Sequence, residues 1–191
     1  MQRGDSILAA EVAIVGLGPV GATLANLLGE RGISVVAIDK ERAVHDKPRA
    51  VTLDHEAMRA FQNVGLSTQV LPHTVPFLRS VYFGLEGRII KQLVTKPAPF
   101  PLGWCPNYLF SQPAVDQILR DGAAARSTVR VLLGADATGI AEEEGCVRID
   151  VSHDDGSRSV IAAQYVVACD GGSSPMRRRL GIGFDDLDFD E

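Results

Sequence analysis

The chain has 191 residues, 46% of them hydrophobic, which suffices for one domain with a buried core and at most a second partial domain. Its 19 basic and 24 acidic residues give a net charge of −5, which argues against a nucleic-acid-binding protein, since such a protein needs a basic face. No apolar run approaches the roughly 20 residues that span a bilayer, and residues 1–6 lack a signal-peptide pattern. Three scattered cysteines indicate neither a disulfide framework nor a zinc site, so we expect a cytoplasmic protein without a membrane partner.

The first 39 residues predict a strand, a helix and a second strand. Residues 11–15 (EVAIV) and 33–38 (ISVVAI) are short apolar runs rich in β-branched residues, as in buried strands. Between them, residues 20–31 carry apolar side chains at helical spacing, and Gly32 ends that helix. So short a succession predicts a βαβ unit with two parallel strands and a right-handed crossover.

A glycine-rich turn, GLGPVG at 16–21, joins the first strand to the helix and matches the pattern GxGxxG. Gly16 permits the tight turn, Gly18 lets a pyrophosphate approach the backbone, and Gly21 lets the helix pack against the sheet. The helix start adds unpaired N–H donors and a partial positive charge. The alternative interpretation is a glycine turn that binds no ligand.

Asp39 closes the second predicted strand, 18 residues after Gly21. A carboxylate there can accept hydrogen bonds from both ribose hydroxyls and repels a 2′-phosphate, so the pattern predicts FAD or NAD rather than NADP. The candidate cofactor-binding residues of this region are Gly16, Gly18, Pro19, Val20, Gly21 and Asp39.

The middle of the chain does not continue the βα alternation of an ordinary NAD dehydrogenase, which favours an FAD-binding fold. The predicted elements are a polar loop at 40–53, a helix at 54–64 ended by Gly65, a β-hairpin at 80–93, an irregular stretch at 96–106 with four prolines, and a helix from a Ser111 N-cap to about Arg126.

The last third returns to strands, predicted at 129–133, 146–151, 159–163 and 165–169. The final strand (YVVAC) ends in Asp170-Gly171, and Ser173 or Ser174 can cap a short helix from Pro175 to Gly181. We expect this last strand and the acidic tail at 185–191 to lack neighbours, leaving an exposed sheet edge.

Four segments resemble, in order, the motifs of the single-component FAD-dependent aromatic hydroxylases, the flavoprotein monooxygenases related to p-hydroxybenzoate hydroxylase. They are GLGPVGATLANLLGERG, PRAVTLDHEAMRAFQNVGL, FSQPAVDQILRDG and YVVACDGGSSPMRRRLGI. The resemblance covers almost everything from Ala9 to Gly183. Within the family it is similar to the 3-(3-hydroxyphenyl)propionate hydroxylase branch, to which VLPHT at 70–74 and LGW at 102–104 add.

The resemblance implies an α/β fold, a Rossmann-like FAD-binding domain with a parallel sheet and an inserted hairpin and strands. Residues 1–191 would be the incomplete N-terminal FAD-binding domain, and 70–108 part of a substrate-domain insertion. The implied activity is hydroxylation of a phenolic aromatic acid, of the 3-hydroxyphenylpropionate type, with FAD as cofactor, NADH or NADPH as co-substrate, and O2. The implied partner is a small aromatic substrate, and a homodimer is one possible assembly.

Further cofactor-binding candidates follow from the resemblance. Lys40 stands where relatives often have an arginine beside the adenine, and Arg49 is similar to a loop arginine near the flavin or its phosphates. Gln112 corresponds to a glutamine near the ribityl chain, and Ala137 to a position whose backbone holds the adenine. Asp170 belongs to an Asp-Gly motif linked to FAD phosphate and nicotinamide binding.

Arg177 and Arg178 are candidate helpers for the nicotinamide nucleotide, although a solvated helix face is the more ordinary role of such a run. Arg49 could likewise be only solvated, Gln112 only a helix cap, and Asp170 only part of a strand-ending turn. We assign no catalytic residue and no metal ligand, because the adjacent acids and histidine at 54–56 do not converge on one point.

The family's second flavin motif, a Gly-Asp pair, does not occur after Arg49. We therefore expect this polypeptide alone to bind FAD weakly or not at all and to hydroxylate nothing. Two other functions stay open: a flavin-dependent reductase or dehydrogenase of the same fold, and a non-catalytic nucleotide-binding module.

Overall fold

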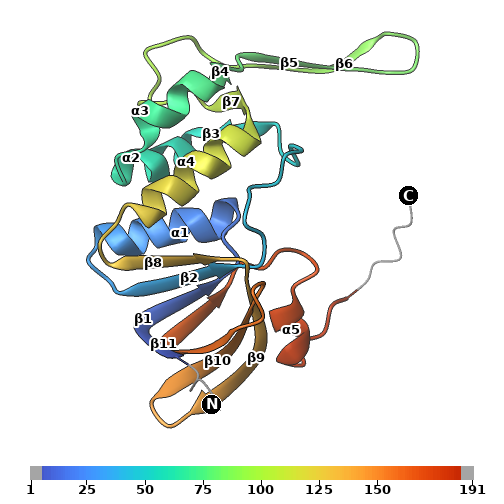
Figure 1. Cartoon of the computed structure of the whole chain (residues 1–191). Helices are drawn as coiled ribbons and strands as arrows, with labels where there is room; N and C mark the ends of the chain where they lie inside the picture. The colour runs from blue at the N-terminus through green and yellow to red at the C-terminus, as the bar shows by residue number, and fades with distance from the viewer. Residues whose placement is uncertain (1–5, 186–191) are drawn as a thin grey trace. The chain divides into compact units, whose positions relative to one another are not determined.

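A computed structural model describes residues 6–185 of the chain (Figure 1). The chain forms two compact units, one joining Met1–Ala43 to Ala123–Glu191 and the other comprising Val44–Gly122. We call them unit 1 and unit 2. The expectations for residues 1–5 and for the acidic tail from residue 186 onward lie outside the described residues.

Unit 1 contains a six-stranded mixed sheet with the order β8-β2-β1-β11-β10-β9. Strands β8, β2, β1 and β11 are parallel and lie side by side in Figure 1, and β10 and β9 continue the sheet in antiparallel pairing. The strands span Val129–Leu133 (β8), Val35–Asp39 (β2), Ser6–Val15 (β1), Arg158–Ala168 (β11), Cys146–His153 (β10) and Ala135–Glu143 (β9). The predicted α/β class with a parallel sheet is confirmed.

Helix α1 (Pro19–Glu30) connects β1 to β2 and completes the predicted βαβ unit. Its small buried residues, Ala22 and Ala25, let it lie close to the strands. Strand β2 is buried on both faces from Val35 to Ile38, which explains why its sequence is a continuous apolar run rather than an alternating one. Burial of each of its larger side chains, Val35, Val36 and Ile38, contributes about 1.5–3 kcal/mol to folding.

Two of our strand predictions for unit 1 were incomplete. The strands expected at 159–163 and 165–169 form one strand, β11, which the polar Gln164 does not interrupt. The expectation that the last strand lacks neighbours was wrong, because residues Tyr165–Ala168 pair in parallel with Val12–Val15 of β1. Strand β9 was not predicted, since its sequence contains Gly139 and two glutamates instead of an apolar run.

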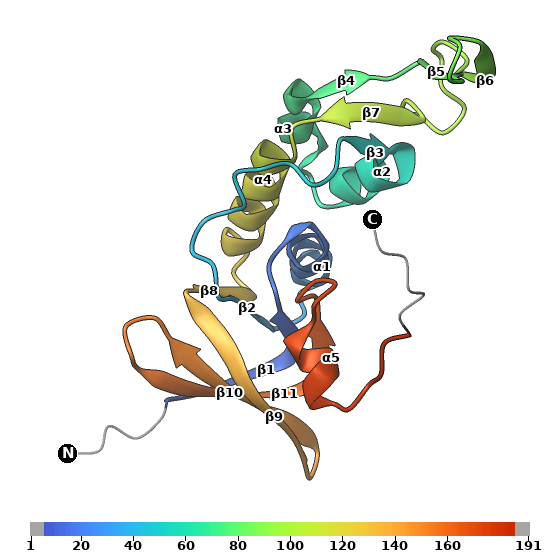
Figure 2. The ribbon, with the colours of Figure 1, turned by 90° about the vertical axis from the view of Figure 1, so that its right-hand side faces the viewer.

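Unit 2 combines short helices with a small sheet. Helix α2 (His55–Asn63) was predicted, and its N-cap Asp54 accepts a hydrogen bond from the backbone N–H of Ala57 at 2.9 Å. Figure 2 shows β7 between β3 and β4 in a three-stranded antiparallel sheet. The other elements are β3 (Thr52–Asp54), α3 (Ser67–Val70), a 3-10 helix (Leu71–His73), β4 (Thr74–Pro76), β7 (Asn107–Phe110) and α4 (Gln112–Ala124).

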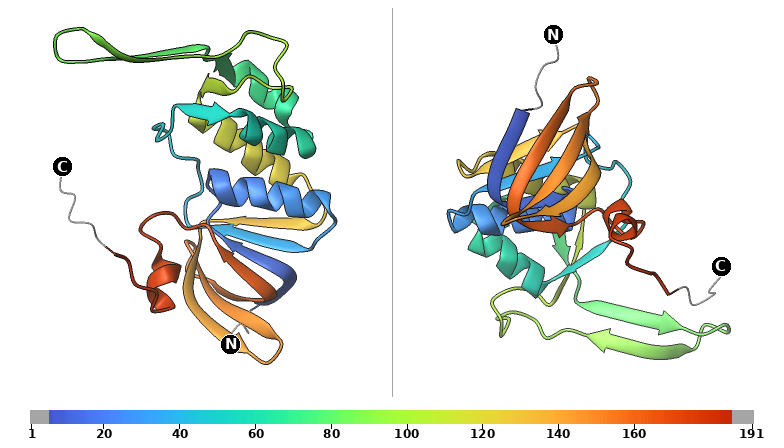
Figure 3. Two further views of the ribbon diagram at one scale, coloured as in Figure 1. Left: turned by 180° about the vertical axis from the view of Figure 1, so that it is seen from behind. Right: turned by 90° about the horizontal axis from the view of Figure 1, so that it is seen from below.

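The predicted hairpin of unit 2 consists of β5 (Arg79–Phe83) and β6 (Ile89–Val94). It extends away from the three-stranded sheet of the same unit, and every residue of β6 is exposed (Figure 3). The irregular stretch at 96–106 contains no helix or strand, as the four prolines indicated. In unit 1 the chain then closes with α5 (Pro175–Arg179), which lies against β9.

Candidate functional site

The carboxyl ends of the parallel strands in unit 1 lie at one edge of the sheet. The strand register pairs Val15 with Ile38 and with Ala168, and Asp39 with Leu133. Loops that follow parallel strands therefore meet there, which is where open α/β sheets bind ligands.

Two glycines of the turn after β1 are required by the packing of the protein itself. Gly16 has a φ of +96°, and a Cβ on it would lie 2.4 Å from the carbonyl oxygen of Cys169. A Cβ on Gly21 would lie 1.9 Å from the carbonyl oxygen of Gly16. Both glycines thus allow α1 and the end of β11 to approach the turn closely.

Gly18 differs from these two glycines, because a Cβ built on it would meet nothing within 4 Å. It is the N-cap of α1, and Pro19 occupies the first helical position, where a missing N–H costs nothing. Val20 in the first turn is 69% exposed. The start of α1 is therefore open to a ligand and carries the partial positive charge of a helix N-terminus.

Asp39 joins the end of β2 to the glycine turn. One carboxylate oxygen, Oδ2, accepts a hydrogen bond from the backbone N–H of Leu17 at 2.8 Å, and the other, Oδ1, accepts one from Glu41 at 2.8 Å. The side chain is half-buried, whereas the neighbouring Lys40 is exposed. These contacts hold a negative charge at a fixed place beside the start of α1.

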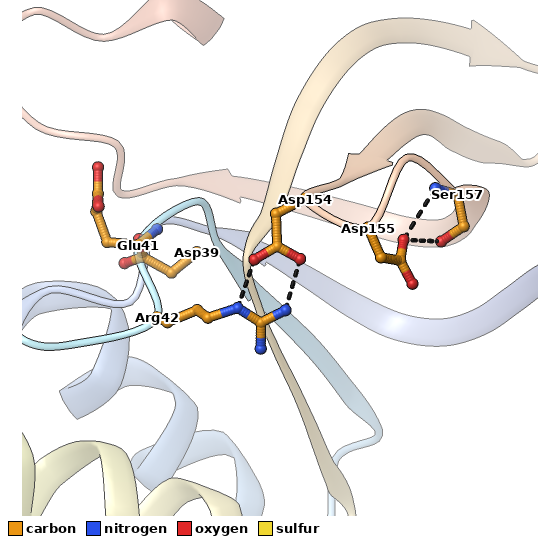
Figure 4. A network of polar contacts seen from close by, with 6 residues as sticks. All are labelled: Asp39, Glu41, Arg42, Asp154, Asp155 and Ser157. Atoms are coloured by element: carbon orange, nitrogen blue, oxygen red, sulfur yellow. Dashed lines mark hydrogen bonds and ion pairs between the residues drawn. The ribbon is translucent and has the colours of Figure 1, made fainter.

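An ion pair ties the loop after β2 to the turn between β10 and β11 (Figure 4). The guanidinium of Arg42 donates from Nε and Nη2 to both carboxylate oxygens of Asp154, and this lowers the pKa of the Asp154 carboxyl below its usual range. A Cβ on Gly134, whose φ is +68°, would lie 2.5 Å from Asp154 Oδ2. Gly134 therefore leaves room for this pair, and our sequence analysis identified none of the three residues.

The predicted residues Ala137 and Asp170 also belong to unit 1. Ala137 is buried on β9, where it pairs with Val151 of β10. Asp170 follows β11, and its carboxylate accepts hydrogen bonds from Ser174 Oγ at 2.6 Å and from the backbone N–H of Met176 at 2.9 Å. Asp170 thus holds the start of α5, and its backbone nitrogen adjoins Gly16.

Arg177 and Arg178 both engage backbone carbonyls near α5. Arg177 donates to the carbonyl of Ile182 at 2.8 Å and lies over the ring of Phe184, 5.0 Å from its centroid. Arg178 donates to the carbonyl of Ser173. These contacts stabilise the ends of the short helix.

In unit 2, the candidate residues Arg49 and Gln112 lie together through a hydrogen bond. The side-chain oxygen of Gln112 accepts hydrogen bonds from the backbone N–H groups of Arg49 at 2.7 Å and Ala50 at 2.8 Å. Gln112 is 5% exposed, while residues 49 and 50 are exposed. The glutamine therefore anchors the backbone of the arginine-bearing loop, a contact that its sequence position did not reveal.

The sequence profile of the family described as FAD binding domain matches residues 9–188. The chain belongs to this family. The predicted family resemblance is thereby confirmed. The glycine pattern left open the choice between FAD and NAD, and the family to which this domain belongs is an FAD-binding one.

Curated relatives are similar over most of this chain. The 3-(3-hydroxy-phenyl)propionate/3-hydroxycinnamic acid hydroxylase 1 of Burkholderia vietnamiensis is 42% identical over 178 residues, covering 92% of this chain. The corresponding hydroxylase of Mycolicibacterium smegmatis is 42% identical over 177 residues, covering 93% of this chain. The chain spans only 28% and 31% of these two relatives.

Solved structures share the fold. The p-nitrophenol 4-monooxygenase of Pseudomonas putida superposes with a TM-score of 0.81 at 24% identity, over 94% of this chain and 45% of that one. The flavin-dependent monooxygenase PieE, solved in complex with FAD and substrate, gives a TM-score of 0.80 at 19% identity, over 93% and 33%.

Within residues 6–185, no helix has both the length and the apolar character needed to cross a bilayer. The same residues contain no group of three or more histidine, cysteine or acidic side chains placed to hold a metal ion. Asp54 and Glu56, which adjoin His55, instead serve the start of α2 as its cap and as an acidic first-turn residue.

Proposed function

We propose that unit 1 binds the adenosine diphosphate part of FAD at the carboxyl edge of its sheet. The observation that carries this proposal is Gly18, which leaves open space at a helix N-terminus beside the fixed carboxylate of Asp39. The residues present fit the group. Backbone N–H groups at the start of α1, from Val20 onward, would hold the pyrophosphate beside Pro19, which has no N–H of its own, and Asp39 would accept from the ribose hydroxyls.

The other predicted residues of unit 1 have secondary roles in this proposal. Lys40 is exposed next to Asp39 and would lie beside the adenine, where the Ala137 backbone would also contribute. Asp170 would act near the FAD phosphate, and its two hydrogen bonds to α5 fix its carboxylate. Gly16 and Gly21 would act indirectly, because they let the turn and α1 pack closely.

In unit 2, Arg49 would approach the flavin or its phosphates, and Gln112 would act near the ribityl chain. A carbonyl oxygen has two lone pairs, and the Arg49 and Ala50 N–H groups use both on Gln112. Gln112 would therefore face a ligand only as a hydrogen-bond donor, through its amide nitrogen.

We further propose that the chain is the FAD-binding part of an enzyme that hydroxylates a phenolic aromatic acid of the 3-(3-hydroxyphenyl)propionate type. The names and 42% identity of the curated relatives support this activity. Bound FAD would supply the redox chemistry, with NADH or NADPH as reductant and O2 as oxidant. The residues described here would bind and orient the cofactor.

The nucleotide site is tested by titrating the chain with FAD and, separately, with ADP, which carries only the part that Gly18 and Asp39 would hold. We expect saturable binding of both, with FAD bound weakly. Gly18→Val should weaken both by about tenfold or more with an unchanged circular dichroism spectrum, because the side chain would fill ligand space at a position where a Cβ meets no protein atom within 4 Å.

Gly183→Val is the matched control, since a Cβ there also meets nothing within 4 Å, and it should bind like the wild type. A folded wild-type chain that takes up neither FAD nor ADP would contradict the proposal. For the reaction, a protein extended to the length of the relatives should form a diol from 3-(3-hydroxyphenyl)propionate. Consumption of NADH or NADPH and O2 without diol would favour a reductase instead.

A further inference from the structure

Helix α4 carries three buried polar side chains spaced four residues apart. Gln112, Asp116 and Arg120 are 5%, 4% and 7% exposed, and they lie beside the buried apolar residues Val115 and Leu119. Polar groups at such burial normally have a structural or functional task, because taking them out of water without hydrogen bonds is costly.

The amide orientation of Gln112 is set from two sides. Its oxygen must point to the N–H groups of Arg49 and Ala50, since only an acceptor can serve two donors. Its nitrogen then points to Asp116, with 3.4 Å between Nε2 and Oδ2. A carboxylate at this place favours the amide nitrogen and opposes a rotated amide that would bring oxygen against oxygen.

Asp116 is not otherwise satisfied. Its second oxygen, Oδ1, is buried and has no hydrogen-bond partner among the described residues. Burial raises the pKa of the Asp116 carboxyl, while the contact with Gln112 and the positive charges of Arg49 and Arg120 act in the opposite direction. Packing alone does not readily explain a buried carboxyl with one oxygen left without a hydrogen bond.

We propose that Asp116 is a positioning residue for the loop that carries Arg49. It fixes the amide of Gln112, and through that amide it fixes the backbone of Arg49 and Ala50. The role toward the cofactor rests on the proposed function, because only then does Arg49 face FAD. The positioning itself is a property of unit 2 alone.

The same helix provides a matched control on its exposed side. Gln117 donates from Nε2 to Asp121 Oδ1 at 2.8 Å, with the same residue types and the same spacing of four. Among residues 6–185 this second pair has no hydrogen bond to a loop backbone, so it reports what a Gln–Asp pair contributes to α4 by itself.

The test is hydrogen exchange of the Arg49 and Ala50 amides, measured by NMR on the whole chain. These residues are exposed, so their hydrogen bonds to Gln112 are what slows exchange. Asp116→Ala should speed exchange at the two amides by about tenfold while leaving the strands of unit 1 protected. Asp116→Asn keeps an acceptor for Gln112 and should stay within about threefold of the wild type, and Asp121→Ala should change neither amide.

Unchanged exchange at Arg49 and Ala50 in Asp116→Ala, or an equal rise across the whole chain, would overturn the positioning role. If Asp116→Ala does not fold, a pH titration of the wild-type chain, followed by NMR, tests the positioning role instead. As Asp116 takes up its proton, at a pKa raised by burial, the Gln112 side-chain signals and both amide signals should shift with one midpoint. Absence of a shared midpoint overturns the inference. If exchange at the Arg49 and Ala50 amides changes as expected but the chain binds no FAD, the proposed function is refuted and the positioning role of Asp116 stands.

Discussion

The loop after β2 in unit 1 and the loop around Arg49 in unit 2 are both held by a side chain that accepts two backbone N–H groups. Asp39 divides the task between two oxygens, one for Leu17 and one for Glu41. Gln112 receives both donors on one oxygen. The difference lies in the surroundings, because Asp39 is half-buried at the end of β2 beside the start of α1, whereas Gln112, the first residue of α4, is buried against the carboxyl of Asp116. A charged anchor suits the first place and a neutral anchor the second.

The largest effect is expected from Gln112→Glu, which tests whether the anchor in unit 2 must be neutral. The new carboxylate would face Asp116, and two negative charges at this distance in a buried site cost about 2 kcal/mol of unfolding free energy at pH 7. Urea unfolding measures this loss. Gln117→Glu, which faces Asp121 on the exposed side, should lose no more than about 0.5 kcal/mol.

The pH dependence of this variant follows from the raised pKa of Asp116. A carboxyl whose folded pKa is above its unfolded value of 3.8 contributes most to stability below 3.8 and loses that contribution as pH rises through the folded pKa. A second carboxylate beside it enlarges this effect. The deficit of Gln112→Glu should therefore shrink as pH falls from 7 to 5, and an unchanged deficit would contradict the like-charge explanation.

A smaller effect is expected from Asp39→Asn, which makes the anchor in unit 1 neutral. An asparagine has one side-chain oxygen, so it can keep only one of the bonds to Leu17 and Glu41, at a cost of about 1 kcal/mol in urea unfolding. ADP affinity should fall by about tenfold, since the ribose loses a charged acceptor. Equal stability and equal affinity would show that charge is irrelevant at this end of β2.

The smallest effect at neutral pH is expected from Arg42→Gln, because the Arg42–Asp154 pair is exposed and exposed pairs contribute little. The contribution of the pair to the free energy of unfolding can be measured by lowering the pH. The lowered pKa of Asp154 means that its contribution is present above 3.8 and is lost as pH falls through the folded pKa. Arg42→Gln should therefore lose less stability than the wild type between pH 5 and 3, and 0.5 M salt should reduce the difference. Asp155, whose pKa is lowered chiefly by Ser157, keeps its contacts in this variant.

The parts of the site that depend on neighbouring residues could be predicted from the sequence. The glycine turn, Asp39 and the βαβ unit lie within 39 residues, and their chemistry follows from local spacing. The cap of α5 by Ser174 and the hairpin of unit 2 were predicted for the same reason. Gly18 and Ser174 act at helix starts that a short segment determines, whereas Gly16 is also required by the approach of Cys169, which local spacing does not show.

The missed parts depend on residues far apart in the chain. Arg42 and Asp154 are separated by 112 positions, and Gly134, whose φ of +68° already favours glycine, also leaves room for their pair. Strands β3, β4 and β7 have three or four residues each and are stabilised by pairing with one another, so no periodic pattern marks them. Asp116 was visible four residues after Gln112, but its task depends on where Gln112 points.

Strand β11 has a consequence for the order in which the protein can be made. Val15 ends β1, and its neighbour on one side is Ala168 of β11. That side of β1 therefore has no pairing strand until the ribosome has synthesised β11. The start of α1 and Asp39 are synthesised early, whereas Cys169 and Asp170, whose backbone lies against Gly16, follow much later. A chain stalled before residue 160 would leave the side of β1 that faces β11 as an open sheet edge, with which other chains could pair.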